Sequence, residues 1–465
     1  MGGGLLQLVA YGAQDVYLTG NPQITFFKVV YRRHTNFAIE AIQQTPTGSN
    51  SLGSRVSFQI TRNGDLIHRV YFYGKIAATG NVALVPNFGH KLLKTIELEI
   101  GGQRIDKHYS EWLYIWNELS LPVGKRDGYN VMVGANGRNI STKLTSGQKY
   151  ELYVPLEFWF CRNVGLALPL IALQYHEVKI NIEYESDVLM VDKAATNFTF
   201  EEETRAVDNT RAYDANDKLT GSVKLEEATL WVDYIFLDTD ERRRFAQLSH
   251  EYLIEQLQFT GTETLNNNTN NRIKLNFNHP CKELVWVAKP KFDKKASWYN
   301  YTDKDHVDLT KEGVAAGLPS SSSNYITNFT ASNYMFGYDF LNANGTPLTN
   351  ASTPFADAIL QLNGNDRFSV RDGAYFSYVQ PYQHHTNIPS NPGISVYSFA
   401  LKPEDHQPSG TLNMSRIDTA TLMVTTKDVI KYTTGSTTFD GINIYAVNYN
   451  VLRILSGMGG LAYSN

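Results

Sequence analysis

The chain has 465 residues, of which 42% are hydrophobic and 19% are charged, and its formal net charge is −4. These values exclude a disordered chain, and the slight acidic excess argues against a protein that coats packaged nucleic acid. The two cysteines, Cys161 and Cys281, are too few for a disulfide framework and suit a reducing compartment. No apolar run reaches the roughly 18 residues that a transmembrane helix needs.

Residues 1–23 form a polar N-terminal arm rather than a targeting segment. The arm lacks the basic start, the apolar stretch and the cleavage site of a signal peptide. A glycine follows the initiator methionine, but Leu6 stands where a myristoylation signal requires Ser or Thr. Asn21-Pro22 predicts a turn, and Ile24–Val30 then predicts the first apolar strand.

Most of the segments that follow alternate apolar and polar residues with a period of two. Such one-sided strands are typical of antiparallel sheets packed in a sandwich, so the fold class is all-β. Residues 284–287 and much of 442–455 are apolar on both faces and predict central strands. The side chains expected in a first core are Val56, Phe58, Ile60, Ile96, Leu98, Val178, Ile180 and Ile182, and those expected in a second core are Ile273, Leu275, Phe277, Leu284 and Trp286.

Two helices are predicted. The first begins after Ser110, which we expect to cap it, and ends before Pro122. Its apolar stripe at spacings of three and four predicts a helix packed over one end of a sandwich rather than a cofactor groove; it comprises Trp112, Ile115, Trp116 and Leu119. A second, shorter helix is expected over Thr239–Ser249, where acidic residues suit the N-terminus.

Three segments of the first half recur in the same order in the second half. IEAIQQT at 39–45 matches IEQLQFT at 254–260, SRVSFQI at 54–60 resembles NRIKLNF at 271–277, and HRVYF at 68–72 aligns with ELVWV at 283–287. The nearly constant offset predicts two copies of one β-domain. We expect the first over 24–205, a polar linker over 206–222 and the second over 223–465.

Signatures of catalysis or metal binding are absent from the sequence, which predicts no cofactor, no metal site and no enzymatic activity. His384-His385 is the only histidine cluster, and its Pro/Asn-rich surroundings are typical of a surface loop. The basic run Arg242–Arg244 predicts a solvated helix face, with a contact to a protein partner as the alternative.

Long motifs at both ends of the chain point to one family. GAQDVYLTGNPQITFFKVVYRRHTNFA at 12–38, SFALKPEDHQPSGTLNMSRID at 398–418 and NYNVLRILSGMGGLAYSN at 448–465 strongly resemble the major capsid proteins of large icosahedral nucleocytoplasmic DNA viruses. SEWLYIWNELSLP at 110–122 is similar as well, so the resemblance runs end to end. It is closest to the algal-virus and marseillevirus-like members.

The resemblance implies a double jelly roll, that is, two eight-stranded sandwiches in tandem. It implies a structural protein of the virion's outer capsid that assembles in the host cytoplasm. Three copies would form a nearly hexagonal capsomer that contacts minor capsid and penton proteins. The chain would neither contact nucleic acid directly nor span a membrane, although the shell can overlie an inner membrane. The arm would lie beneath the capsomer against inner capsid proteins, through Leu5, Leu6, Leu8, Tyr11 and Tyr17.

The segment 291–366 is rich in Ser, Asn, Thr and Gly, and is too long for an ordinary connection. We expect an insertion on the outer surface of the capsomer, pinned by aromatic residues that include Trp298 and Tyr299. Its possible glycan acceptors are Asn300, Asn328, Asn344 and Asn350.

Two other functions stay open on the sequence alone. A carbohydrate-binding sandwich would present Trp298, Tyr299 and Tyr301 as an open aromatic platform. A β-sandwich hydrolase or lyase would need converging carboxylates or a catalytic triad, which the sequence does not reveal.

Overall fold

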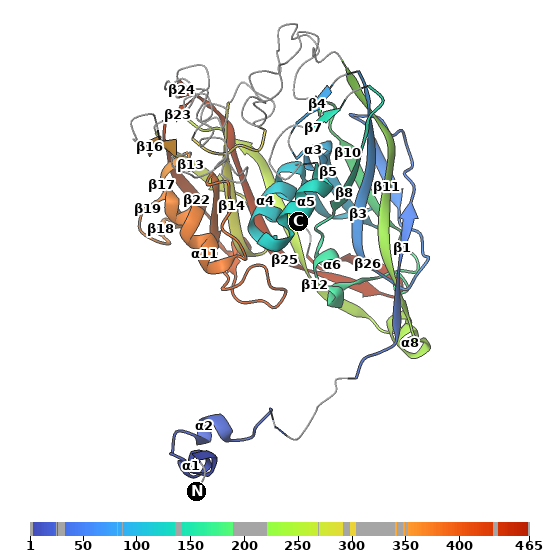
Figure 1. The fold of residues 1–465 in the computed structure, drawn as a ribbon, viewed down its shortest axis with the longest axis vertical. Helices are drawn as coiled ribbons and strands as arrows, with labels where there is room; N and C mark the ends of the chain where they lie inside the picture. The colour runs from blue at the N-terminus through green and yellow to red at the C-terminus, as the bar shows by residue number, and fades with distance from the viewer. Residues whose placement is uncertain are drawn as a thin grey trace.

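The computed structural model describes residues 3–24, 26, 33–80, 82–85, 87–134, 142–144, 146–188, 221–267, 269–291, 298–303, 340–341, 347–348, 352–430 and 436–463. These residues form two antiparallel β-sandwiches and an N-terminal arm that extends away from both of them (Figure 1). Within the described part of the chain, no helix is long and apolar enough to cross a membrane.

The first sandwich consists of a five-stranded and a four-stranded sheet. The first sheet has the order β1 (Phe37–Gln44), β11 (Ser222–Leu237), β3 (Leu66–Thr79) and β8 (Lys149–Pro155), and the short β9 (Leu168–Pro169) also pairs with β3. The second sheet has the order β2 (Arg55–Gln59), β10 (Val178–Tyr184), β5 (Leu93–Ile100) and β6 (Gln103–Tyr109).

The second sandwich repeats this topology. One sheet has the order β12 (His250–Glu263), β25 (Phe439–Leu455), β14 (Pro280–Pro290) and β20 (Ile394–Ser398), joined by β21 (Leu412–Asn413) and β26 (Met458–Leu461). The other has the order β13 (Asn270–Leu275), β22 (Ala420–Thr426), β17 (Phe355–Leu362) and β18 (Asn365–Asp366), and β19 (Arg371–Asp372) pairs with β17. In each sandwich the first strand pairs with a long strand near its end, β1 with β11 and β12 with β25, and the two four-strand orders make an eight-stranded jelly roll, so the predicted double jelly roll is confirmed.

In the described ranges, three two-stranded ribbons lie outside these sheets. They are β4 (Val82–Leu84) with β7 (Thr142–Leu144), β15 (Phe340–Leu341) with β16 (Pro347–Leu348), and β23 (Val429–Ile430) with β24 (Ser436–Thr437).

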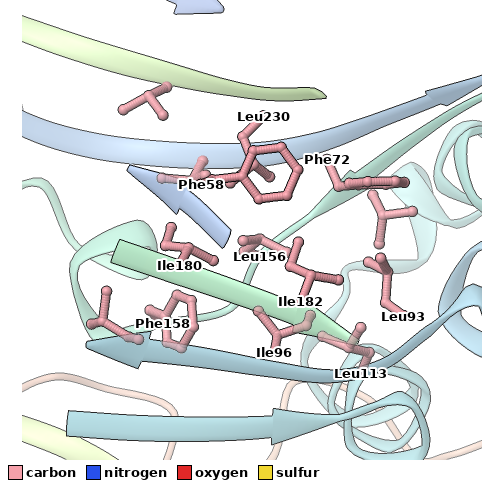
Figure 2. Packing of buried hydrophobic residues seen from close by; sticks show 14 of the residues in the cluster. Phe58, Phe72, Leu93, Ile96, Leu113, Leu156, Phe158, Ile180, Ile182 and Leu230 are labelled. Atoms are coloured by element: carbon pink, nitrogen blue, oxygen red, sulfur yellow. The ribbon is translucent and has the colours of Figure 1, made fainter. Parts of the chain in front are cut away.

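Alternating side chains fill the two cores as the sequence predicted. All thirteen residues expected in the cores are buried. Figure 2 shows Phe58, Ile180, Ile182 and Ile96 meeting Phe72 and Leu230 between the sheets of the first sandwich. The two cores are not wholly separate, because Ile254, Leu452 and Ile454 of the second sandwich join the first cluster.

The helices of the described residues are short and lie in the arm, between the sandwiches or beside them. They are α1 (Gly3–Val9), α2 (Val16–Thr19), α3 (Phe88–Leu92), α4 (Ser110–Ser120), α5 (Val123–Val133), α6 (Trp159–Arg162), α8 (Thr239–Gln247) and α11 (Gln380–His384), with single helical turns η1 (Val164–Leu166), η4 (Tyr375–Val379) and η5 (Met414–Arg416).

Both predicted helices are confirmed, with one correction. Ser110 is the first helical residue of α4 and does not cap it, because Tyr109 occupies the N-cap position and makes no side-chain cap bond. In α8 the carboxylate of Asp238 accepts a hydrogen bond from the backbone N–H of Thr239, as expected at a helix start.

The predicted domain boundary is wrong. β11 follows the proposed linker 206–222, yet it pairs with β1 and β3 in the first sandwich. The first sandwich therefore extends to Leu237, and α8 connects it to β12. A strand can return to its sheet after a long excursion because hydrogen bonding between strands does not require nearness in sequence.

The start of the first domain and the extent of the insertion also need correction. Ile24 and Phe26 are exposed and lie outside any strand, and the first strand of the sandwich begins at Phe37; the rest of the strand predicted over 24–30 lies outside the described residues. The predicted insertion 291–366 is too long, because β17 at Phe355–Leu362 belongs to the second sandwich.

Candidate assembly surfaces

The junction between the two sandwiches is built around α4. Its apolar side chains pack on the outer face of the sheet β12–β25–β14–β20, where ring centroids of Trp112 and Tyr445 lie 5.4 Å apart. Leu113 points the other way, into the core of the first sandwich. The helix is thus buried on two sides, and its predicted stripe fills the space between two domains rather than covering one end of a sandwich.

A carboxylate of α4 adds polar contacts to this apolar junction. Glu111 Oε1 lies 2.5 Å from Lys289 Nζ, and Glu111 Oε2 accepts a 2.6 Å hydrogen bond from Asn443 Nδ2 and a 3.2 Å bond from the Tyr445 hydroxyl. Burial and the nearby Glu111 carboxylate raise the pKa of Tyr445 well above its usual value. The hydroxyl therefore stays protonated and available as a donor.

A second polar group crosses the junction nearer to β12. The Glu255 carboxylate forms ion pairs with Arg162 of the first sandwich, at 2.9 Å, and with Lys282 of the second, at 2.7 Å. The Arg162 guanidinium also lies over the ring of Trp116, 4.1 Å from its centroid. Truncating one member of such a group leaves uncompensated buried charge, so these contacts hold the two sandwiches in one arrangement.

His385 does not lie in a solvated loop, contrary to the sequence prediction. Its ring nitrogens lie 3.0 Å from Glu283 and 2.8 Å from Glu404, and its side chain is fully buried. Burial alone would lower the pKa of His385, but the two carboxylates outweigh it and raise the pKa to about 9. The sequence did offer one signal for this contact. Glu283 precedes the apolar run 284–287, and a carboxylate buried with such a strand needs a charged or hydrogen-bonding partner elsewhere in the chain.

The arm presents the apolar residues that the resemblance assigned to contacts with inner capsid proteins. Leu5, Leu6, Leu8, Tyr11 and Tyr17 are all exposed, and neither α1 nor α2 has a buried residue. Figure 1 shows both helices well separated from the sandwiches, below α8. The arm takes no part in either core.

The residues expected to bind sugars form no open platform. Tyr299 and Tyr301 are completely buried, and the ring of Tyr114 from α4 lies 4.9 Å from that of Tyr299. Trp298 is partly buried and packs against the same cluster. These three rings are part of the junction between the sandwiches, so the carbohydrate-binding alternative is not supported.

Asn300 was wrongly predicted as an outer-surface glycan acceptor. It is only 2% exposed, and its side-chain oxygen accepts hydrogen bonds from the backbone N–H and the hydroxyl of Thr302. The other three candidates, Asn328, Asn344 and Asn350, lie outside the described residues.

The basic run of α8 is largely exposed. Arg242 lies 3.0 Å from the buried carboxylate of Asp65, and Arg244 lies 3.4 Å from Glu241 within the same helix. Among the residues that the structure describes, no group of three or more His, Cys, Asp or Glu side chains is placed to hold a metal ion.

Comparisons with known proteins agree with this architecture. The protein family described as "Major capsid protein N-terminus" matches residues 25–238 of this chain. The family described as "Large eukaryotic DNA virus major capsid protein" matches residues 241–460. The boundary between the two matches falls at α8, where the strand pairing also divides the sandwiches.

Relatives match the chain over its whole length. It is 46% identical to the major capsid protein of Pyramimonas orientalis virus and 45% identical to that of Paramecium bursaria Chlorella virus 1, and each alignment covers 100% of both chains. Among solved structures, PBCV-1 VP54 is 40% identical with a TM-score of 0.70, over 95% of this chain and 100% of that chain. The Faustovirus major capsid protein, 14% identical with a TM-score of 0.67 over 96% of this chain and 94% of that one, shares the fold.

These homologues are structural proteins, not enzymes. Two successive matches cover nearly the whole chain, and its two jelly rolls correspond to them one by one. The chain therefore belongs to the family of major capsid proteins of large eukaryotic DNA viruses.

Proposed function

We propose that this chain is the main building unit of the outer icosahedral shell of a large DNA virus, and that it assembles as a homotrimer. The observation that carries the proposal is the junction at α4, which fixes two sandwiches of the same topology side by side in one chain. Three such chains would present six similar edges, which allows a threefold particle to tile a hexagonal lattice. A related chain occurs in the PBCV-1 virus capsid, 39% identical with a TM-score of 0.68.

The partners follow from the exposed parts of the molecule. The chain would bind copies of itself within the capsomer and then neighbouring capsomers. The capsomer as a whole would contact minor capsid and penton proteins. The arm, with the exposed Leu5, Leu6 and Leu8, would bind inner capsid proteins. An amphipathic segment of this kind gains stability when a partner covers its apolar face. The proposal also places the chain in the outer capsid of the virion and its assembly in the host cytoplasm. The insertion between Lys291 and β17 would lie on the outer surface of the capsomer.

Light scattering and electron microscopy of the purified protein test the proposal together. One chain has a mass of 52.4 kDa, so a homotrimer has about 157 kDa. We expect that mass in solution and particles with a nearly hexagonal outline in images. A stable, folded monomer at micromolar concentration would contradict the proposal, because permanent shell interfaces are large and leave little free subunit.

A further inference from the structure

Residues 385–391, which connect α11 to β20 in the second sandwich, cross the last turn of α4 in the first. We call this segment the strap. The backbone N–H of Asn387 donates a hydrogen bond to the Leu119 carbonyl oxygen at 3.0 Å, and its side-chain amide donates to the Leu121 carbonyl oxygen. The last carbonyl groups of a helix have no partner within it, so the strap caps α4 from the other domain.

The strap also binds a side chain of the same helix. The backbone N–H and the hydroxyl of Ser390 donate to Glu118 Oε2 at 2.9 and 2.6 Å. This carboxylate lies 3.7 Å from Arg126, so its charge is partly balanced within the first sandwich. The C-terminal end of α4 is therefore tied to the second sandwich through both its backbone and its Glu118 side chain.

The other end of the strap is held by His385, whose ring lies between two carboxylates. Nδ1 lies 2.8 Å from Glu404 Oε1, and Nε2 lies 3.0 Å from Glu283 Oε2. A neutral imidazole has one N–H, so one of its nitrogens would turn a lone pair towards a carboxylate oxygen. Both contacts are favourable only when the ring carries two protons. Glu404 also accepts hydrogen bonds from the backbone N–H and the hydroxyl of Thr386, so it holds two consecutive residues of the strap.

The charges around His385 balance only while the ring is protonated. Six ionised side chains from both sandwiches form the network, and they are the cations Arg162, Lys282 and His385 and the anions Glu255, Glu283 and Glu404. Burial opposes the ionisation of Glu283, but the three cations outweigh it and lower the pKa of this carboxyl. Tyr449 of β25 adds no charge, because burial, helped by Glu255 and Glu283, raises the pKa of its hydroxyl. In the loop that carries Glu404, Lys402 pairs with Asp405 at 4.0 Å.

Loss of the proton from His385 would leave one excess negative charge in this network. The side chains of Lys282, Glu283 and His385 have no exposed surface, so water cannot compensate that charge in place. A buried charge without a partner is costly, and the cost is relieved when the groups separate and become hydrated.

We propose that the strap is a proton-operated lock on the junction between the sandwiches. It is closed while His385 is charged, and it then holds the last turn of α4 on the second sandwich. When His385 loses its proton, the strap opens and this turn is released. The lock lies within one chain and does not depend on the proposed trimer.

The pH range of the lock follows from its two states. In the closed strap, burial lowers the pKa of His385, but the two carboxylates outweigh burial and raise the pKa to about 9, whereas a ring exposed by opening returns towards the ordinary value of 6.5. The closed state therefore binds the proton more tightly, and its advantage is complete below pH 6.5. The equilibrium constant for opening should rise about tenfold per pH unit from there to pH 9 and then level off.

Hydrogen exchange of the full-length protein, followed by mass spectrometry of peptides from the strap, measures this opening. The backbone N–H groups of Thr386, Asn387 and Ser390 all donate hydrogen bonds in the closed state. After correction for the intrinsic effect of pH on exchange, their protection should fall about tenfold per unit between pH 6.5 and 9. Peptides from the last turn of α4, 117–121, should lose protection over the same range. Peptides from β10, in the core of the first sandwich, should keep theirs.

Two variants test whether His385 senses the pH. His385→Gln is neutral throughout, so its strap should be weakly protected and independent of pH. Glu404→Gln removes one of the two carboxylates, so the fall in protection should level off at a lower pH than in the wild type. His384→Gln is the matched control and should keep the wild-type profile, since the His384 ring lies 3.0 Å from the Leu401 carbonyl oxygen rather than between carboxylates.

Four results would overturn the proposal. The first is a strap whose protection in the wild type does not change with pH, and the second is an equal fall in His385→Gln. The third is a strap that opens while the last turn of α4 stays protected, because the lock would then not act on the junction. The fourth is an equal loss of protection in β10, which would mean that the whole protein unfolds.

Discussion

Glu111 of α4 and Lys289 of β14 form an ion pair across the junction of the two sandwiches, with 2.5 Å between Oε1 and Nζ. The other oxygen of the same carboxylate accepts hydrogen bonds from Asn443 and Tyr445. One side chain of the first sandwich therefore satisfies three donors of the second. If the carboxylate is removed, those donors lose their partner in a place that water reaches poorly, and an unsatisfied buried donor costs more than its bond contributes.

We therefore expect Glu111→Ala to lower the free energy of unfolding by about 1–3 kcal/mol. Urea unfolding followed by circular dichroism measures the change. The matched control is Glu251→Ala, which removes the exposed pair with Arg453 and should change stability by about 0.5 kcal/mol or less. Equal effects of the two substitutions would show that the junction does not depend on this carboxylate.

The burial of His385 between Glu283 and Glu404 predicts a pH dependence. The pKa of His385 is raised from 6.5 in the unfolded chain to about 9 in the fold, so the folded state binds the proton more tightly. The resulting stability is fully present below pH 6.5 and is lost as the pH rises towards 9. The loss amounts to at most about 3 kcal/mol.

The comparison with His385→Gln isolates this contribution, because the titration of other groups cancels in the difference. Thermal or urea unfolding at pH 6 and pH 9 should show a wild-type advantage at pH 6 that largely disappears at pH 9. His384→Gln is the matched control, since the His384 ring lies 3.0 Å from the Leu401 carbonyl oxygen rather than between two carboxylates, and should leave the pH profile unchanged. A constant difference between wild type and His385→Gln across this range would rule out a charged His385.

The core could be predicted from the sequence because a strand's side chains alternate with a period of two. The expected alternation at Val178, Ile180 and Ile182 is what the structure shows. The repeat was also predicted correctly, since β1, β2 and β3 occupy the same places in the first sandwich as β12, β13 and β14 in the second. Its residue-by-residue alignment was less accurate. It paired Phe72, which faces a core, with Val287, which faces α4, because a shift of one residue reverses the faces of a strand.

The junction could not be predicted in the same way, because its contacts join residues far apart in the chain. His385 meets Glu283 within the second sandwich, and Glu111 meets Lys289 across the junction; in each pair the two residues lie far apart in the sequence. The place of β11 was missed for a related reason. A change in composition marks a loop, but it does not reveal to which sheet the next strand returns.

Two isoleucines allow the contribution of core packing to stability to be compared with that of an exposed apolar side chain. Ile182 is completely buried between the sheets of the first sandwich, whereas Ile24 is 94% exposed. Ile182→Ala should lower the free energy of unfolding by about 2–5 kcal/mol, because it leaves a cavity among side chains that cannot fully collapse. Ile24→Ala should change it by about 0.5 kcal/mol or less. Urea unfolding of both variants measures this difference, and a large effect at Ile24 would place the end of the arm in a folded contact.

The last prediction concerns the arm. Deletion of residues 1–22 should leave the unfolding midpoint and the trimer unchanged, because none of the residues described in α1 or α2 is buried against the sandwiches. The truncated trimers should fail to build or hold a shell, since they lack the apolar side chains that the proposed inner partners would cover.

A triple substitution of Leu5, Leu6 and Leu8 by serine should reproduce this assembly defect, because it removes the apolar face of α1 without shortening the chain. Gln7→Ser, in the same helix, is the matched control and should assemble normally. Electron microscopy of shells formed with the other capsid proteins, together with light scattering of the free trimers, measures both effects. Unfolding of the truncated protein would make the arm part of the fold. Normal shells from the triple variant would show that the arm's leucines do not bind the inner partners.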